Sequence, residues 1–278
     1  QDNLAGGVDG YIGHISADGS QLLACTYNGT SQYDQNYFVQ IDTEGDIYVV
    51  GQTLGDYPVS EGVYANNNSG QFIQKFTPDL SESLWSTRVG SGNGVINISP
   101  SAFLVTNCGE IFLSGWGGVL NNNNNGGGTA GLPFSGDAFQ QATDGNDFYL
   151  MVLAPNAEAL EYATYFGGFE SSEHVDGGTS RFDKSGTVYQ AVCAGCGSNN
   201  DFPTQPGVWS ETNPSTNCNL GVFKFKLSSV TASAEVDGPG IVCPGTEFNL
   251  VNLSEGADTF TWSLDGETSN DTELSYSF

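Results

Sequence analysis

Cysteine, histidine and acidic residues gather in the second half of the chain, and these are the side chains most able to do chemistry. Cys193 and Cys196 form a CxxC pair, and Cys218 follows 22 residues after Cys196. Three interpretations are open: a redox motif, a zinc site completed by Cys218 and His174, or a disulfide. The redox interpretation lacks the strand-to-helix setting that such motifs need. We favour a disulfide between one of this pair and Cys218, with Cys196 preferred over Cys193 by a small margin; it would close a loop of about twenty residues and contribute about 3 kcal/mol.

Carboxylate and amide oxygens cluster in two further segments, and such oxygens suit a hard cation such as Ca²⁺. The candidate ligands are Asp144, Asn146, Asp147, Glu170, Glu173 and Asp176. No complete calcium-loop motif is present, and the alternative is that both segments are solvated turns. We expect no cofactor, but these oxygens leave Ca²⁺ binding open.

The two histidines, His14 and His174, give little support to catalysis, because no nucleophile-elbow motif accompanies either of them. Pairs of carboxylates also catalyse glycoside hydrolysis. Among 32 acidic residues, however, some pair must lie at a suitable distance by chance. We therefore expect no catalytic residues and no enzyme, and we keep a carbohydrate-active enzyme as the alternative.

The net charge of the chain narrows the class of molecule that it can bind. Six Lys and Arg stand against 32 Asp and Glu, which gives a net charge of −26. Such a chain repels phosphate backbones and anionic lipid surfaces, so nucleic acid is excluded and divalent cations or basic partners are favoured. No apolar stretch approaches the roughly 20 residues of a membrane helix, and six cysteines favour an exported, disulfide-bonded protein. The sequence begins at Gln1 without a Met or a signal peptide, so we expect a piece of a longer extracellular protein.

A pattern that recurs along the first 230 residues indicates the fold. Its first element is a strand in which an aromatic and a large apolar residue lie four apart: Tyr11–Ile15, Phe72–Phe76, Tyr149–Leu153 and Phe223–Leu227. Second and third strands follow in three units, at Ala24–Tyr27, Trp85–Arg88 and Tyr162–Tyr165, and after Gly45, Gly109 and Gly186. A fourth element places a Pro before a Gly and an aromatic residue, beginning at Pro58, Pro133 and Pro203.

Four strands to a unit are the signature of a β-propeller blade. We therefore predict about three four-stranded antiparallel sheets arranged radially, plus the start of a fourth. The prediction places Tyr11, Phe72, Tyr149 and Phe223 at equivalent positions. So few blades cannot close a ring without an exposed strand edge. Either further blades exist, or a partner covers the open edge.

The third unit resembles the bacterial SBBP-type β-propeller repeat. Tyr162–Gly168 is similar to the Tyr-x-Thr-Tyr-x-Gly-Gly strand of that family, and Asp201–Trp209 is similar to its Asp-Phe-Pro-Thr-x-Pro-Gly-x-aromatic segment. The earlier units depart from the pattern, since Val59 stands in place of Thr and Arg88 in place of the second Tyr. The resemblance covers residues 1–230.

The repeat pattern stops, and a different sequence pattern begins at Ser233. Cys243–Thr246, Phe248–Ser254 and Thr259–Trp262 resemble the opening strands of a PKD-type immunoglobulin-like domain, with Trp262–Gly266 in place of its Trp-x-Phe-Gly-Asp-Gly motif. The chain ends before the last strands of such a sandwich. We thus predict an all-β chain, with a partial β-propeller over residues 1–230 and the N-terminal part of an immunoglobulin-like domain over residues 231–278.

Repeats of this kind followed by PKD-like domains resemble large secreted surface proteins of Bacteroidetes-type bacteria. The resemblance implies export by the type nine secretion system and a part in adhesion or gliding motility. We expect a non-enzymatic binding module at the cell surface or outside the cell. Its partners would be other surface or secretion-system proteins or glycans, without membrane insertion. A structural spacer of a large adhesin is a further alternative.

Overall fold

The computed structural model describes residues 7–118, 127–176, 180–227, 234–237, 245–254, 260–264, 266–271 and 273–277. The chain divides into two compact units, Gln1–Leu227 and Ser228–Phe278. Strands dominate both units, and one short helical turn, η2 (Pro155–Ala157), interrupts the first. The chain is therefore all-β, as predicted. No helix in the described part of the chain is both long and apolar enough to span a membrane.

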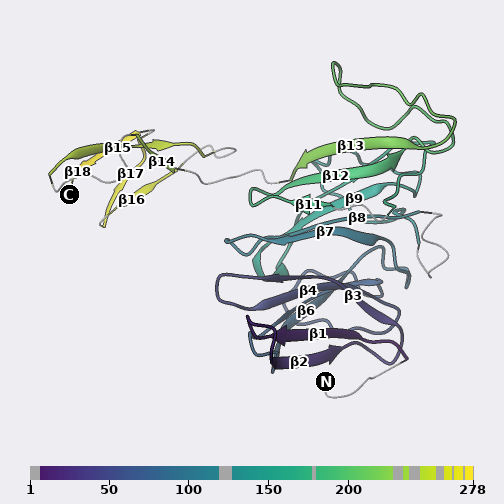
Figure 1. The fold of residues 1–278 in the computed structure, drawn as a ribbon, viewed down its shortest axis with the longest axis horizontal. Helices are drawn as coiled ribbons and strands as arrows, with labels where there is room; N and C mark the ends of the chain where they lie inside the picture. Colours follow the sequence, from purple (N-terminus) through teal and green to yellow (C-terminus); the bar gives the residue numbers. More distant parts are fainter. Residues whose placement is uncertain are drawn as a thin grey trace. The chain divides into compact units, whose positions relative to one another are not determined.

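Successive antiparallel sheets form the first unit, and Figure 1 shows them as layers from β1 and β2 to β13. The first sheet pairs β1 (Gly10–Ile15) with β2 (Leu22–Asn28). The second holds β3 (Asp34–Ile41), β4 (Ile47–Thr53), β5 (Gln71–Phe76) and β6 (Ser83–Val89). The third holds β7 (Ser99–Val105), β8 (Ile111–Trp116), β9 (Phe148–Leu153) and β10 (Leu160–Phe166). The last holds β11 (Arg181–Phe182), β12 (Thr187–Ala194) and β13 (Asn219–Lys226).

The predicted repeat unit began with the strand that carries the aromatic residue. In the structure that strand is the third strand of its sheet, as β5, β9 and β13 show. Among the described residues the sheets have two, four, four and three strands, so the prediction of three four-stranded sheets is wrong. The fourth element of the repeat is a loop between the second and third strands of a sheet, because its Pro lacks an N–H and its Gly62 and Gly207 adopt positive φ. The place of a strand is taken instead by β3, β7 and β11, which share no obvious motif.

Three of the four predicted equivalent aromatic residues do lie in equivalent register. Each is paired with the second-strand residue of its own unit: Tyr11 with Tyr27, Phe72 with Arg88, and Tyr149 with Tyr165. Phe223 differs, because it pairs with Gln190, only four residues after the turn glycine of its sheet, whereas Phe72 and Tyr149 pair with residues six after theirs. Its ring packs in the core against Phe148 and Phe166, at centroid distances of 5.2 and 4.6 Å.

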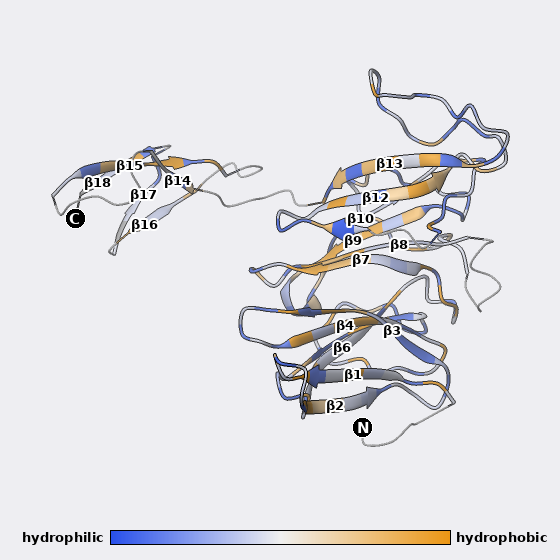
Figure 2. Ribbon diagram, in the orientation of Figure 1, coloured by the Kyte–Doolittle hydropathy of each residue, from blue (hydrophilic) through white to orange (hydrophobic). Residues whose placement is uncertain are grey.

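Consecutive sheets pack face to face, and a separate apolar core fills each interval. In β8, Ile111 and Leu113 pack toward the β3–β6 sheet, while Phe112 packs toward the β11–β13 sheet. Alternate residues of a strand point to opposite faces, so a strand between two sheets is apolar on both. Figure 2 shows this apolar character along the inner strands. The outward faces of the first and last sheets leave large apolar side chains exposed, among them Leu22 and Val222.

The second unit consists of two small antiparallel sheets. One has the order β14 (Ala234–Asp237), β15 (Glu247–Asn252), β18 (Glu273–Ser277), and the other is the hairpin of β16 (Trp262–Leu264) and β17 (Glu267–Ser269). The Trp262 indole N–H donates to the Asp271 carbonyl at 2.7 Å and closes the hairpin. Cys243 and Asp265 lie outside the described residues, so the immunoglobulin-like arrangement stays a prediction.

Candidate functional site

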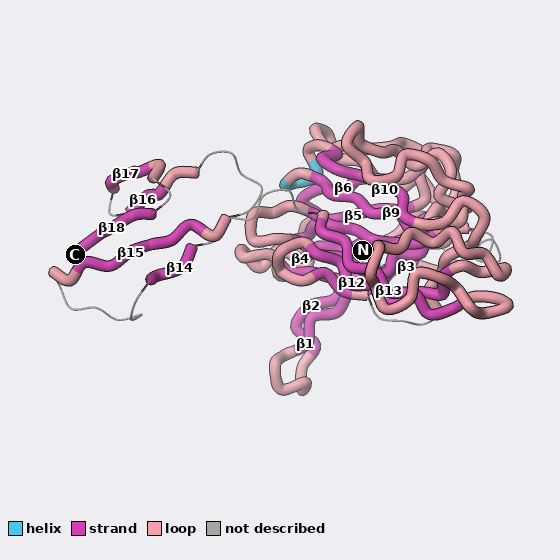
Figure 3. Tube along the Cα trace, turned by 90° about the horizontal axis from the view of Figure 1, so that it is seen from above, coloured by secondary structure: helices cyan, strands magenta, loops and turns pink. Residues whose placement is uncertain are grey.

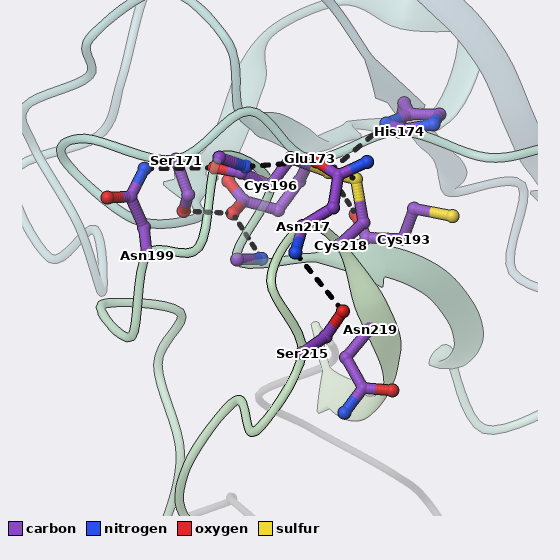
Figure 4. Close-up of a disulfide and its surroundings, with 12 residues drawn as sticks. Ser171, Glu173, His174, Cys193, Cys196, Asn199, Ser215, Asn217, Cys218 and Asn219 are labelled. Carbon is purple, nitrogen blue, oxygen red and sulfur yellow. Dashed lines mark hydrogen bonds between the residues drawn. A yellow bond between two sulfur atoms is a disulfide. The ribbon is translucent and has the colours of Figure 1, made fainter.

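The long loop between β12 and β13 is closed at its base by a disulfide between Cys196 and Cys218, as predicted. Figure 4 shows this bond and the polar side chains around it. Inside the loop, the Asn213 side-chain amide lies 2.9 Å from the Gly195 carbonyl and 3.1 Å from the Asn199 carbonyl. The disulfide and these hydrogen bonds fix the two ends of the loop against the sheet.

His174 lies beside the disulfide and forms part of the zinc alternative. Its Nδ1 is 3.8 Å from Cys196 Sγ, and its Nε2 is 3.3 Å from Asp176 Oδ1. Because Cys196 and Cys218 are oxidised, they offer no thiolates, so the four-ligand zinc set does not form with the disulfide closed. Burial, together with the Asp176 carboxylate, raises the pKa of the remaining Cys193 thiol. A thiol with a raised pKa is a poor nucleophile and a poor metal ligand.

Two of the six predicted calcium ligands, Asp147 and Glu173, come together in the interior. Both are buried, at 0% and 1% exposure, and Glu173 N donates to the Asn146 carbonyl at 3.0 Å. Asn146 itself is half-buried, while the other three candidates, Asp144, Glu170 and Asp176, are exposed. The six residues therefore do not form one ligand set.

Burial dominates the electrostatics of this pair. The pKa of Asp147 is raised to about 7, chiefly by burial and further by the charges of Asp144 and Asp201. The pKa of Glu173 is also raised to about 7, chiefly by burial and further by the charge of Asp147, against hydrogen bonds that lower it. A retaining glycosidase uses two carboxyls that flank the sugar, whereas the Asp147 and Glu173 carboxyls are buried.

An apolar pocket of about 740 Å³ runs along the free edge of β13, beneath the stapled loop. Its apolar lining includes Phe139, Phe166, Phe202, Val208, Val222 and Phe223. At its rim, Trp209 is fully exposed to solvent. One signal of this site was present in the sequence, because Trp209 is the aromatic residue that ends the fourth element of the repeat.

The other sheets show what occupies the corresponding space. In the second sheet the equivalent loop lies against the fourth strand, β6, where Ser60 N donates to Ser86 O at 2.9 Å. In the third sheet it lies against β10, where Ser135 N donates to Ala163 O at 3.0 Å. In both, the fourth strand fills the space between the third strand and the loop. In the last sheet no described strand does so, and the pocket lies there instead.

The structure places the two histidines on different parts of the first unit, His14 on β1 and His174 in the segment after β10. His14 is exposed on β1 opposite Ala24, and the nearest partners of His174 are Asp176 and a disulfide sulfur. No protein-family model matches the sequence, and the search of curated proteins finds no relative. The candidate site therefore rests on geometry: a stapled loop, a fully exposed Trp and an apolar pocket at an open strand edge.

Proposed function

We propose that this chain is a non-catalytic binding module that accepts an extended segment of a partner protein as the fourth strand of the β11–β13 sheet. One observation carries the proposal: the pocket beside β13 lies where β6 and β10 lie in the two complete sheets. Strand addition combines main-chain hydrogen bonds, which supply affinity, with side-chain pockets, which supply specificity.

The strands that fill this place elsewhere define the chemistry of the segment. β6 places Trp85 and Val89 in the core between sheets, and β10 places Ala163 and Tyr165 there. Both strands carry a Thr at the position before Arg88 and Tyr165. The accepted segment is thus a short β-strand with two aromatic or aliphatic residues two or four positions apart and a Thr between them.

A second copy of this chain is a poor occupant of the same edge. β13 carries Lys224 and Lys226, both exposed. Pairing two β13 strands would bring like charges together, and Lys on an edge strand is a common defence against such pairing. The remainder of the molecule carries a strong negative charge, which adds to the preference for a different, neutral or basic partner.

The β-propeller arrangement belongs to the same proposal. The first strands of successive sheets contact one another, β3 with β7 and β7 with β11, as the inner strands of neighbouring blades do. The disulfide supports an oxidising, extracellular setting. Together with the resemblance to SBBP-type repeats, these features support a surface or secreted module in adhesion, exported as part of a larger protein.

A peptide that copies Leu160–Phe166 tests the proposal by calorimetric titration into the full chain. We expect saturable binding to wild type and none for the same peptide with Thr164→Pro, which removes a main-chain donor. Val222→Asp in the pocket should abolish binding, while Leu23→Asp, at another exposed position, on β2, should leave it intact. Absence of binding to wild type, or equal binding of the two peptides, would refute strand acceptance.

A further inference from the structure

The buried carboxyls between the β7–β10 and β11–β13 sheets have no function in strand binding. Asp147 immediately precedes β9, and its carbonyl accepts from Gly117 N at 3.1 Å, which holds this backbone in place. Both of its carboxylate oxygens are buried and lack a hydrogen-bond partner in the described part of the chain. The Thr143 hydroxyl, whose proximity lowers the pKa of Asp147, lies 2.8 Å from the Thr129 hydroxyl.

Glu173 points into the same space from the loop after β10. Its Oε1 accepts from the Ser171 hydroxyl and from Gly195 N, while its Oε2 accepts from Gly168 N at 3.2 Å. A Cβ on Gly167 would lie 2.0 Å from Asp147 Oδ1 and 2.7 Å from Glu173 Oε2, so these oxygens are less than about 5 Å apart. Gly167 therefore leaves open the space onto which both carboxylates converge.

A third carboxylate lies close by. Asp201 Oδ2 accepts from Glu170 N at 2.6 Å, whereas its Oδ1 is buried and has no partner among the described residues. No cationic side chain is among the main influences on the pKa of Asp147, Glu173 or Asp201. Three acidic groups thus gather without a compensating positive charge.

Burial of like charges at this distance is strongly unfavourable unless something neutralises them. The free ligand atoms are all carboxylate oxygens, and hard oxygen donors of this kind select Ca²⁺ over the softer transition metals. We propose that Asp147 and Glu173 bind a calcium ion that ties the turn before β9 to the loop after β10. Since Ca²⁺ takes about six to eight oxygens, water and neighbouring oxygens complete its shell.

The first unit of the repeat offers an internal comparison. Asp9 precedes β1 as Asp147 precedes β9, and Asp9 and Asp34 lie 3.0 and 3.1 Å from a Cβ placed on Gly29. There, however, Asp34 Oδ2 accepts from both Thr30 N and the Thr30 hydroxyl, at 2.6 and 2.8 Å. Those donors satisfy one oxygen of Asp34, while its Oδ1 is buried without a partner among the described residues. At Asp147 neither oxygen has a partner in hydrogen-bond geometry among the described residues, so the ion is assigned to the Asp147 site.

Thermal unfolding of the full chain with Ca²⁺ and with a chelator tests this assignment. We expect Ca²⁺ to raise the Tm of wild type by several degrees, and Asp147→Asn to abolish the rise. In chelator, Asp147→Asn should unfold no earlier than wild type, because the amide removes a buried charge; this separates loss of the ion from loss of the fold. Asp144→Asn removes an exposed acid three residues away and should keep the full rise.

Calorimetric titration supplies the stoichiometry, for which we expect one Ca²⁺ lost on Asp147→Asn and retained on Asp144→Asn. No Ca²⁺-dependent rise in wild type would overturn the proposal. An equal rise with Mg²⁺ would also overturn it, since that result indicates general screening of the acidic surface. Loss of the rise in both variants would have the same meaning. None of these outcomes depends on strand binding, so the two proposals stand or fall separately.

Discussion

The β3–β6 sheet and the β11–β13 sheet are built from the same repeat but differ in what covers the third strand. β5 is paired on both sides, and Lys75 on it lies 2.9 Å from both Asp42 and Asp46 and 4.9 Å from the centre of the Tyr48 ring. On β13 the equivalent Lys224 lies 5.3 Å from the centre of the Tyr189 ring, but both it and that ring are exposed. The repeat thus specifies the third strand, while its environment comes from the next segment of chain.

The loops of the two sheets repeat this contrast. Tyr64 ends the fourth element of the first unit, packs against the core and donates its N–H to Ala157 O. Trp209 ends the same element in the third unit and touches solvent on all sides. Phe139 ends this element in the second unit and is only partly covered, with 55% exposure and ring contacts to Phe166 and Phe225, so the covering of this aromatic residue differs from unit to unit. Figure 3 shows the other open end, where the β1–β2 hairpin extends from the remaining sheets of the first unit.

The largest effect should come from a core truncation in the complete sheet. Phe72 is fully buried and stacks on Tyr57 at a centroid distance of 4.0 Å, so Phe72→Ala should cost about 3–5 kcal/mol. Trp209→Ala should change the free energy of unfolding by no more than about 0.5 kcal/mol, because the side chain is fully exposed. Urea unfolding measures both. A large loss of stability for Trp209→Ala in the absence of a partner would contradict the difference in burial between the two sheets.

Removing the Cys196–Cys218 disulfide should have the next largest effect on the free energy of unfolding. The double change Cys196→Ser and Cys218→Ser removes a disulfide that closes a 22-residue separation, which should cost about 3 kcal/mol. It should also weaken peptide binding, because the loop over the pocket is no longer fixed. Cys25→Ser, which removes an exposed free thiol, is the matched control and should change neither quantity. Unaltered peptide affinity in the double variant would show that the loop is not part of the binding site.

The ion pairs of the complete sheet should give a smaller, pH-dependent effect. Burial raises the pKa of Asp42. Hydrogen bonds from Lys75 and from backbone N–H groups lower that pKa by a larger amount, so it lies below the usual value. A depressed carboxyl pKa contributes stability that is present above the unfolded-state value of about 3.9 and is lost as pH falls through the folded-state value. Asp42→Asn should therefore lose stability at pH 7 and flatten its dependence on pH below 4, measured by urea unfolding. Unchanged acid sensitivity would contradict this role for Asp42.

The strands of the repeat could be predicted because residues four apart mark a buried face, and because the turn glycines Gly45, Gly109 and Gly186 all adopt positive φ. The strands β3, β7 and β11 escaped prediction, since cross-strand packing rather than a shared motif determines them. Cysteine spacing predicted a bridge to Cys218 and favoured Cys196 over Cys193 by only a small margin, and the structure has the Cys196–Cys218 bond. The meeting of Asp147 with Glu173 could not be predicted, because two sheets must pack before those segments approach.

Apart from Trp209, the pocket beside β13 had no signal in the sequence, since it lies where the described part of the chain supplies no fourth strand to the sheet. Only comparison with β6 and β10 gives it a meaning. We propose that the edge of β13 is equivalent to the places that β6 and β10 fill in their sheets.

Amide hydrogen exchange at β13 tests that claim most directly. Without peptide, the β13 amides that point away from β12 should exchange much faster than the corresponding amides of β5, which are paired with β6. With saturating Leu160–Phe166 peptide, the account predicts that those β13 amides become as protected as their β5 counterparts, while β2, the exposed edge at the other end, is unchanged. Binding of the peptide without new protection along β13 would contradict it.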